Sequence, residues 1–222
     1  MKRANPEQVA PILKRRYGDH AHYNRRNPME ELLFILCSTK TQESSYLSTY
    51  SALREEFPTF SSLAEAPAEE IAIPLVPGGL YRQKSEAIHK ICTAIVERFG
   101  RLTLAPLRWR DDAECEAFLT ALPGVGKKVA RCVMMYSLDR EVFPVDTHCW
   151  RIALRLGWVR ATQKDGHCCP RDMDRLQKKI PPHLRFSLHV NFVSLGREFC
   201  TAGTALCGEC PLEKICPKIG AR

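Results

Sequence analysis

The chain has 222 residues, 45% of them hydrophobic and 26% charged, so it can bury the core of one large domain or two small ones. Its formal net charge of +8 and its pI near 9.0 indicate a polyanionic partner, most often nucleic acid. The longest apolar run, residues 32–37, is too short to cross a bilayer, and no signal peptide is visible. We therefore expect an intracellular protein that makes no use of a membrane.

Helix signals recur along the chain, whereas the alternation typical of strands is scarce. Asn5-Pro6 and Asn27-Pro28 each combine an N-cap residue with proline at the first helical position, and predict helices reaching Tyr17 and about Ser38. Further helices are expected at about 43–56, 82–99, 112–122, 129–138, 146–156, 172–179 and 184–199. The pattern predicts an all-α protein.

The expected helices suggest two lobes. Those within about 23–140 can form one compact bundle, and the two chain ends, 1–22 and 141–222, would then come together as a second, smaller lobe. The last 23 residues hold too few apolar side chains for a core of their own, so they need a metal or a neighbour to become ordered.

Four cysteines crowd into this C-terminal segment. They are separated by six, two and five residues, and in an intracellular protein such a set predicts metal ligation rather than disulfides. Tetrahedral zinc and a cubane iron–sulfur cluster both take four thiolates. Short loops wrapping one centre slightly favour the cluster, and zinc stays an alternative. The predicted ligands are Cys200, Cys207, Cys210 and Cys216.

A tight turn at Leu122–Lys128 joins the helices expected at 112–122 and 129–138. Gly124 and Gly126 leave backbone N–H groups accessible, and the helix that follows adds its positive end. Such a hairpin can hold a phosphate of a nucleic-acid backbone without reading bases. The alternative is a plain connection whose glycines allow close helix packing.

Three charged residues stand at the starts of two helices. Lys127 and Lys128 follow the hairpin, and Asp146 follows Pro144 at the start of the helix expected at 146–156. An amine can act as a nucleophile and a carboxylate can face a developing cation, as in glycosidic bond cleavage. The alternatives are two solvated lysines and an ordinary N-cap aspartate.

Together these motifs resemble the endonuclease III family of helix-hairpin-helix DNA glycosylases. The resemblance rests on LPGVGKK at 122–128, VDTH at 145–148, the Gly79-Leu80-Tyr81 turn with Lys84 behind it, and the four-cysteine segment, and it covers about 28–217. It implies a two-lobed fold, with a six-helix domain at 23–140 that contains the helix-hairpin-helix at about 112–138. It also implies a [4Fe–4S] cluster domain built from 1–22 and 141–222, and DNA bound in the groove between them.

The resemblance further implies a base-excision-repair enzyme that is both DNA glycosylase and AP lyase. After base flipping, the Lys128 amine would attack the sugar and Asp146 would assist, and β-elimination would cleave the abasic site. The implied partner is double-stranded DNA that contains either a damaged base, expected to be an oxidised pyrimidine, or an abasic site. The protein is expected to bind it as a monomer. The residues expected to contact DNA are Gly124, Val125, Gly126, Lys127, Thr39, Gln42 and Tyr81.

One stretch departs from the family pattern. Thr39 stands where the family typically has a glutamine that fills the gap left by the flipped base, and Gln42 is the nearest substitute. The stretch 143–159 also resembles the catalytic region of plant 5-methylcytosine glycosylases, which keeps mismatched or modified pyrimidines open as substrates. Two further alternatives are a non-catalytic DNA-binding module that retains the hairpin and cluster, and an iron–sulfur electron carrier.

Overall fold

The computed structural model describes residues 4–39, 41 and 43–221. Helices make up its regular structure, and no β-strand occurs among these residues, so the predicted all-α class is confirmed. The chain divides into two compact units. A continuous unit runs from Asn24 to Arg140, and a discontinuous unit combines the N-terminal residues through Tyr23 with those from Glu141 onward.

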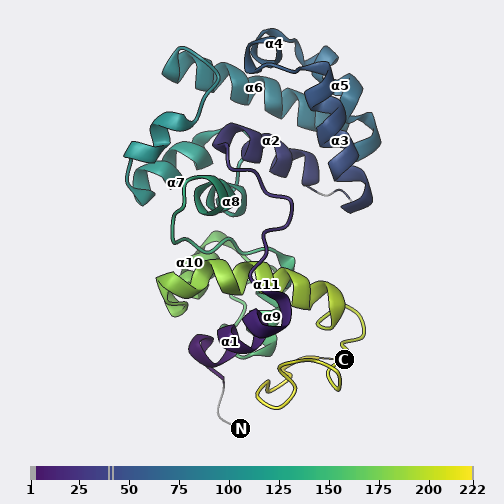
Figure 1. Cartoon of the computed structure of the whole chain (residues 1–222), viewed down its shortest axis with the longest axis vertical. Helices are drawn as coiled ribbons and strands as arrows, with labels where there is room; N and C mark the ends of the chain where they lie inside the picture. The colour runs from purple at the N-terminus through teal and green to yellow at the C-terminus, as the bar shows by residue number, and fades with distance from the viewer. Residues whose placement is uncertain (1–3, 40, 42, 222) are drawn as a thin grey trace. The chain divides into compact units, whose positions relative to one another are not determined.

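The continuous unit holds the helices drawn from dark blue to teal in Figure 1. Asn27 caps the first of them as expected, because its side chain accepts hydrogen bonds from the Met29 and Glu30 amides. The helix that contains Pro74 reaches Leu75 and passes into a 3-10 turn. The helices are α2 (Pro28–Ser38), α3 (Glu43–Glu56), α4 (Phe60–Glu65), α5 (Ala68–Leu75), η1 (Val76–Gly78), α6 (Tyr81–Phe99), η2 (Ala105–Trp109), α7 (Asp112–Ala121) and α8 (Lys127–Ser137).

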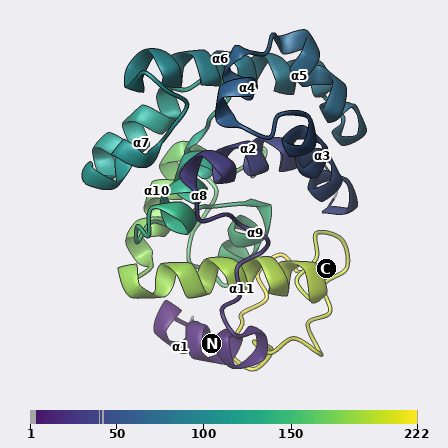
Figure 2. The same cartoon turned by 45° about the horizontal axis from the view of Figure 1, so that its top comes forward.

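The core of this unit is apolar and centred on α2 and α6. Helix α2 packs against α3, α6 and α8, and α5 lies along α6 (Figure 2). One stripe of α6, with isoleucines at 88, 91 and 95, is completely buried, as its helical spacing predicts. Nearly all of α2 is buried, including the charged residue Glu31. The two helices therefore form the rigid support for the loops at their ends.

The discontinuous unit comprises α1 (Pro6–Tyr17), α9 (Thr147–Arg155), α10 (Pro170–Lys179), η3 (Pro182–Leu184) and α11 (Arg185–Glu198). Helix α11 packs against both α1 and α9. The two chain ends also share hydrogen bonds, since Trp158 Nε1 donates to the Ala4 carbonyl at 2.6 Å. None of the helices built from the described residues has the length and apolar character needed to cross a membrane.

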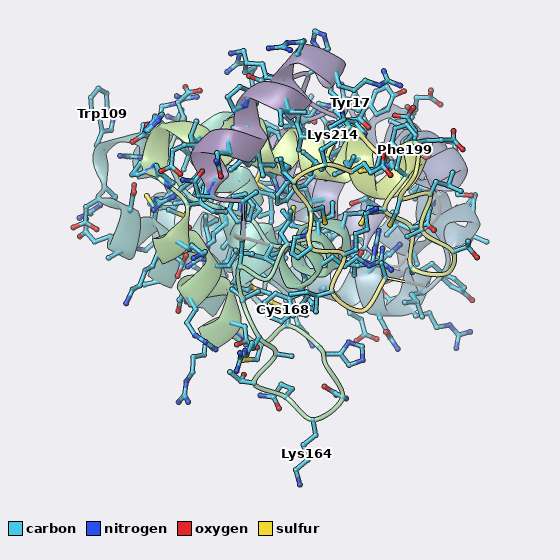
Figure 3. The ribbon with its side chains drawn as sticks, turned by 90° about the horizontal axis from the view of Figure 1, so that it is seen from below. Tyr17, Trp109, Lys164, Cys168, Phe199 and Lys214 are labelled. Carbon is cyan, nitrogen blue, oxygen red and sulfur yellow. The ribbon has the colours of Figure 1, made fainter. Side chains whose placement is uncertain are left out.

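Residues 199–221 follow α11 as a loop without helix or strand, which we call the cysteine loop. Leu212 anchors it in the core of the discontinuous unit. Tyr17 on α1 donates to the Glu198 carboxylate at the end of α11, at 2.9 Å. Figure 3 labels Tyr17 together with Phe199 and Lys214 of the loop.

Candidate active site and cysteine loop

The hairpin between α7 and α8 turns on one left-handed residue. Gly124 has φ +75°, a conformation that glycine adopts without strain, and the Val125 amide donates to the Leu122 carbonyl to close the turn. Val125 itself is buried, with 4% of its surface exposed. Gly126 is the exposed N-cap of α8 and makes no side-chain cap hydrogen bond. The first turn of an α-helix carries N–H groups that have no acceptor within the helix.

Gly126 also leaves room in front of the helix. A Cβ atom built on it would meet no described protein atom within 4 Å, whereas one on Gly124 would meet Ala87 Cβ at 3.5 Å. The fold itself thus does not require glycine at 126. A side chain there would instead occupy the space in front of the α8 amides, where an anion would bind.

The two lysines at the start of α8 have different surroundings. Lys127 Nζ lies 3.1 Å from Glu116 Oε1 on α7, and Arg131 Nε donates to the other oxygen of the same carboxylate at 2.6 Å. Lys127 is thereby held in an ion-pair network across the hairpin, rather than solvated as the sequence alternative expected. Glu116 on α7 thus binds the Lys127 amine.

Lys128 is half-buried and lies within electrostatic range of Glu31 on α2. The Glu31 carboxylate is fully buried and accepts hydrogen bonds from Asn24 Nδ2 at 2.5 Å and from the Arg25 amide at 2.6 Å. Burial raises the pKa of Glu31 to about 7, although these two donors and the positive charges of Lys128 and Arg25 act to lower it. The sequence did not distinguish Glu31 from its neighbour Glu30, since both carboxylates stand in the first turn of a largely apolar helix.

A second turn connects η1 to α6. Leu80 is the N-cap of α6 and holds a left-handed backbone, φ +52°, which is strained for a residue with a Cβ. Its apolar side chain is 46% exposed. Tyr81, predicted to contact DNA, begins α6 directly after it and is partly exposed. We did not single out Leu80 from the sequence, because its strain is visible only in the backbone.

The loop after α2 carries the other two residues predicted to contact DNA. Thr39 is exposed at the C-cap of α2, where its hydroxyl donates to the Ile35 carbonyl at 2.9 Å. Gln42 lies outside the described residues. The described loop thus presents Thr39 to the surface.

Asp146 lies in the discontinuous unit, whereas Lys128 lies in the continuous one. It is the N-cap of α9, and its Oδ1 accepts a hydrogen bond from the Cys149 amide at 2.7 Å. The extended residues before it are buried, and the Pro144 carbonyl lies 2.9 Å from His189 Nδ1. The N-cap interpretation is therefore correct for one carboxylate oxygen of Asp146. The hydrogen bond from the Cys149 amide fixes the position of this side chain.

Helix α9 connects this N-cap to the cysteine loop. Arg151 donates from Nη2 to His148 Nδ1 at 3.0 Å and from Nε to the Cys200 carbonyl at 2.7 Å. One turn further on, the buried Arg155 donates from Nη1 to Cys200 Sγ at 3.2 Å and to the Thr201 carbonyl at 2.7 Å. Two arginines of α9 thus fix the start of the loop.

The four cysteines predicted as ligands line one pocket of the cysteine loop, together with Arg155, Phe199 and Lys218. Two sulfurs accept hydrogen bonds, Cys200 from Arg155 and Cys216 from the Lys218 amide at 3.4 Å. Burial, followed by the charges of the other three thiolates, raises the pKa of Cys210 to about 11. A positively charged metal group would relieve that repulsion.

Among the described residues, no set of three or more His, Cys, Asp or Glu side chains is already arranged as a single-ion site. Four thiols in one pocket match the number of ligands that zinc or a cubane iron–sulfur cluster takes.

Comparison with known proteins identifies the class that this fold and hairpin define. The family model described as HhH-GPD superfamily base excision DNA repair protein matches residues 34–173, which is more than half of the chain. The chain therefore belongs to this superfamily.

Within the superfamily the chain is similar to endonuclease III. It is 30% identical to endonuclease III of Thermotoga maritima over 210 residues, covering 95% of this chain and 91% of the relative. Among solved structures, a non-covalent endonuclease III–DNA complex aligns with a TM-score of 0.81 and 26% identity, covering 97% of this chain and 96% of that one. A trapped endonuclease III–DNA covalent intermediate aligns with a TM-score of 0.79 and 25% identity, covering 97% of both chains. The family resemblance drawn from the motifs is confirmed.

Proposed function

We propose that this protein is a bifunctional DNA glycosylase with AP lyase activity, which removes a damaged base and then cleaves the abasic site. The observation that carries the proposal is the half-buried Lys128 on the first turn of α8, in a chain of this superfamily that is similar to a protein trapped covalently on DNA. An amine at that point can form a covalent bond with an opened sugar. A DNA-binding scaffold or an electron carrier needs no such amine.

The hairpin is proposed to bind one phosphate of double-stranded DNA. Gly124 sets the turn, Gly126 leaves space before α8, and the first amides of the helix face that space. Phosphate binding at a helix start uses backbone amides and the helix dipole, so it positions the duplex without reading its sequence. The net charge of +8 adds a general attraction to DNA.

Lys128 is proposed as the nucleophile and Asp146 as its catalytic partner. The unprotonated Lys128 amine would attack the sugar C1′ and break the bond to the base, which leaves with a proton. The sugar ring then opens: the C1′–O4′ bond breaks, O4′ takes up a proton, and C1′ and the lysine nitrogen form a Schiff base. This Schiff base loses a proton from C2′, the bond to the 3′ phosphate breaks, and water hydrolyses the C=N bond and releases the enzyme. The Asp146 carboxylate would stabilise the positive charge of the sugar and assist proton transfer.

The Lys127 amine is engaged by Glu116, as is Arg131. We therefore assign Lys127 to the support of the hairpin and of its DNA contact. Lys128, which stands at the position of the catalytic lysine in the motif, is assigned to the chemistry.

The residues that would replace the flipped base lie on two loops of the continuous unit. The exposed Leu80, held in a strained backbone, is suited to enter a base stack, and Tyr81 and Thr39 are proposed to contact the DNA beside it. Gln42 remains a proposed contact from its place in the sequence. For substrate we propose an oxidised pyrimidine within double-stranded DNA, recognised by a monomer inside the cell.

The cysteine loop is proposed to hold a [4Fe–4S] cluster through Cys200, Cys207, Cys210 and Cys216, which share one pocket. When bound, the cluster would cross-link four points of a loop that has no helix or strand and little core of its own, and so contribute folding energy. Arg155 and the Lys218 amide would donate to two of the ligand sulfurs.

Borohydride trapping on a duplex with a natural abasic site tests the proposal. The wild type should form a covalent cross-link, Lys128→Gln should not, and the matched variant Lys127→Gln should still do so. Trapping retained by Lys128→Gln would refute the assignment of the nucleophile. Tight duplex binding with no trapping by any of the three proteins would instead establish a non-catalytic module.

A further inference from the structure

Lys84 is a buried lysine that the proposed chemistry does not use. It lies on α6, one turn after Leu80, and is only 8% exposed. A lysine is rarely buried without partners, because desolvation of its charge is costly. Its ammonium has three N–H donors, and each has an acceptor here: the Cys37 carbonyl at 2.9 Å, the Thr41 hydroxyl at 2.6 Å and the Gly78 carbonyl at 3.1 Å.

These three acceptors belong to two loops that are far apart in sequence. Cys37 lies in the last turn of α2 and Thr41 in the loop after it, whereas Gly78 comes directly before the turn that carries Leu80. The Thr41 hydroxyl also donates to the Gly78 carbonyl at 2.8 Å. One ammonium and one hydroxyl thus connect the loop of Thr39 directly to the turn of Leu80.

The turn is also constrained from its other side. A Cβ on Gly78 would lie 2.8 Å from the Thr49 hydroxyl oxygen, and Thr49 is fully buried on α3. Gly78 is therefore pressed against α3, while its carbonyl is directed to Lys84 and Thr41. Leu80 follows two residues later with its strained, left-handed backbone. Such strain persists only where surrounding contacts over-determine the backbone.

We propose that Lys84 is a positioning residue, which holds the loop of Thr39 and the turn of Leu80 in one fixed relation so that both can enter the DNA together when a base is flipped. The inference rests on the proposed function. Lys84 itself touches neither DNA nor the reacting atoms in this scheme. Loss of Lys84 should therefore slow base release, which requires the base to be extruded. It should have less effect on strand cleavage at an abasic site, which has no base to extrude.

The test compares two substrates in single-turnover reactions. One duplex carries thymine glycol opposite adenine, and the other carries a natural abasic site. The variants are Lys84→Met, which keeps the length of the side chain but removes all three donors, and Thr41→Val, which removes the hydroxyl and leaves the charge. Lys90→Met is the matched control, since Lys90 is exposed on the same helix.

Lys84→Met should lose at least about tenfold more in base release than in strand cleavage at the abasic site, because the loss of one charge-assisted hydrogen bond is commonly worth a factor of ten or more. Thr41→Val should show a smaller loss of base release relative to abasic-site cleavage. Lys84→Arg should release the base little faster than Lys84→Met, because a planar guanidinium cannot reach three acceptors around one point. A merely structural role would reduce both activities equally. Equal losses, or losses matched by Lys90→Met, would overturn the proposal.

Amide hydrogen exchange provides a readout that needs no activity. In Lys84→Met the amides of Thr39, Thr41 and Gly79 should all exchange faster than in Lys90→Met, since the two loops would open independently. Unchanged exchange in both loops would overturn the inference even if the enzyme is active. A wild type that is inactive on both duplexes would refute the proposed function, while the exchange data would still decide whether Lys84 joins the loops.

Discussion

The carboxyl of Glu31 should make the stability of this protein fall as pH rises. Burial raises its pKa from an ordinary 4.5 to about 7 in the folded state. Below about pH 4.5 the group is protonated in both folded and unfolded chains. Between 4.5 and about 7 the folded chain keeps a proton that the unfolded chain has lost, so unfolding releases a proton and the free energy of unfolding decreases with pH.

The size of this effect follows from the change in pKa. At 1.36 kcal/mol per pKa unit, a rise from 4.5 to about 7 costs about 3 kcal/mol of stability once the pH exceeds 7. No discount for solvent is needed, since the side chain is fully buried. Glu31→Gln cannot ionise, so this decrease should be absent from the variant, even though glutamine cannot accept from both Asn24 and Arg25 as the carboxylate does.

Urea unfolding from pH 4 to pH 8 measures the effect. Because other groups also titrate, the relevant quantity is the stability of Glu31→Gln minus that of the wild type, which should rise by about 3 kcal/mol over this range. Glu86→Gln, at an exposed position on α6, should show no such change. If the wild type and Glu31→Gln have parallel pH profiles, the reasoning about the buried carboxyl is wrong.

Three further outcomes are expected. Gly124→Ala should lower the free energy of unfolding in urea by about 1–2 kcal/mol, because alanine is strained at the positive φ of this position and not because it clashes. Gly126→Ala should lower it by about 1 kcal/mol or less, yet weaken duplex binding measured by fluorescence anisotropy. Equal effects of the two on binding would contradict the proposed phosphate site. Cys207→Ser should abolish the brown chromophore at about 400 nm and lower the melting temperature of the purified protein. A colourless, zinc-containing wild type would count against the cluster. Leu80→Ala should slow base release while sparing cleavage of abasic DNA, and equal slowing of both would argue against insertion into the base stack.

Local sequence chemistry predicted the helices well. Asn5 and Asn27 cap their helices with the expected side-chain hydrogen bonds, and Asp111 forms a capping box with Glu114. Pro74 lies in the last turn of its helix. Proline removes only its own amide donor, and near a helix end the ring can be accommodated.

The site was predictable only in part. The motifs indicated Lys128 and Asp146 as the proposed catalytic pair. The ion pair of Lys127 with Glu116, by contrast, joins residues eleven positions apart on two helices, and the local pattern does not predict it. Glu31 could not be recognised as buried from its neighbours, since burial of a charge depends on which donors other segments supply.

What the sequence by itself determined is local and covalent: the helix starts, the glycine turn, the order of the motifs and the spacing of four thiols. These follow from the conformational preferences of single residues and their near neighbours, so they require no tertiary contact. The tertiary structure alone decided which charges are buried and what they bind. Lys84 shows the difference: in the sequence it is one basic residue behind a turn, whereas in the fold its three hydrogen bonds join loops that lie about 40 residues apart. Only packing brings those carbonyls within reach of one ammonium, because hydrogen-bond partners for a buried charge are set by three-dimensional proximity and not by sequence distance.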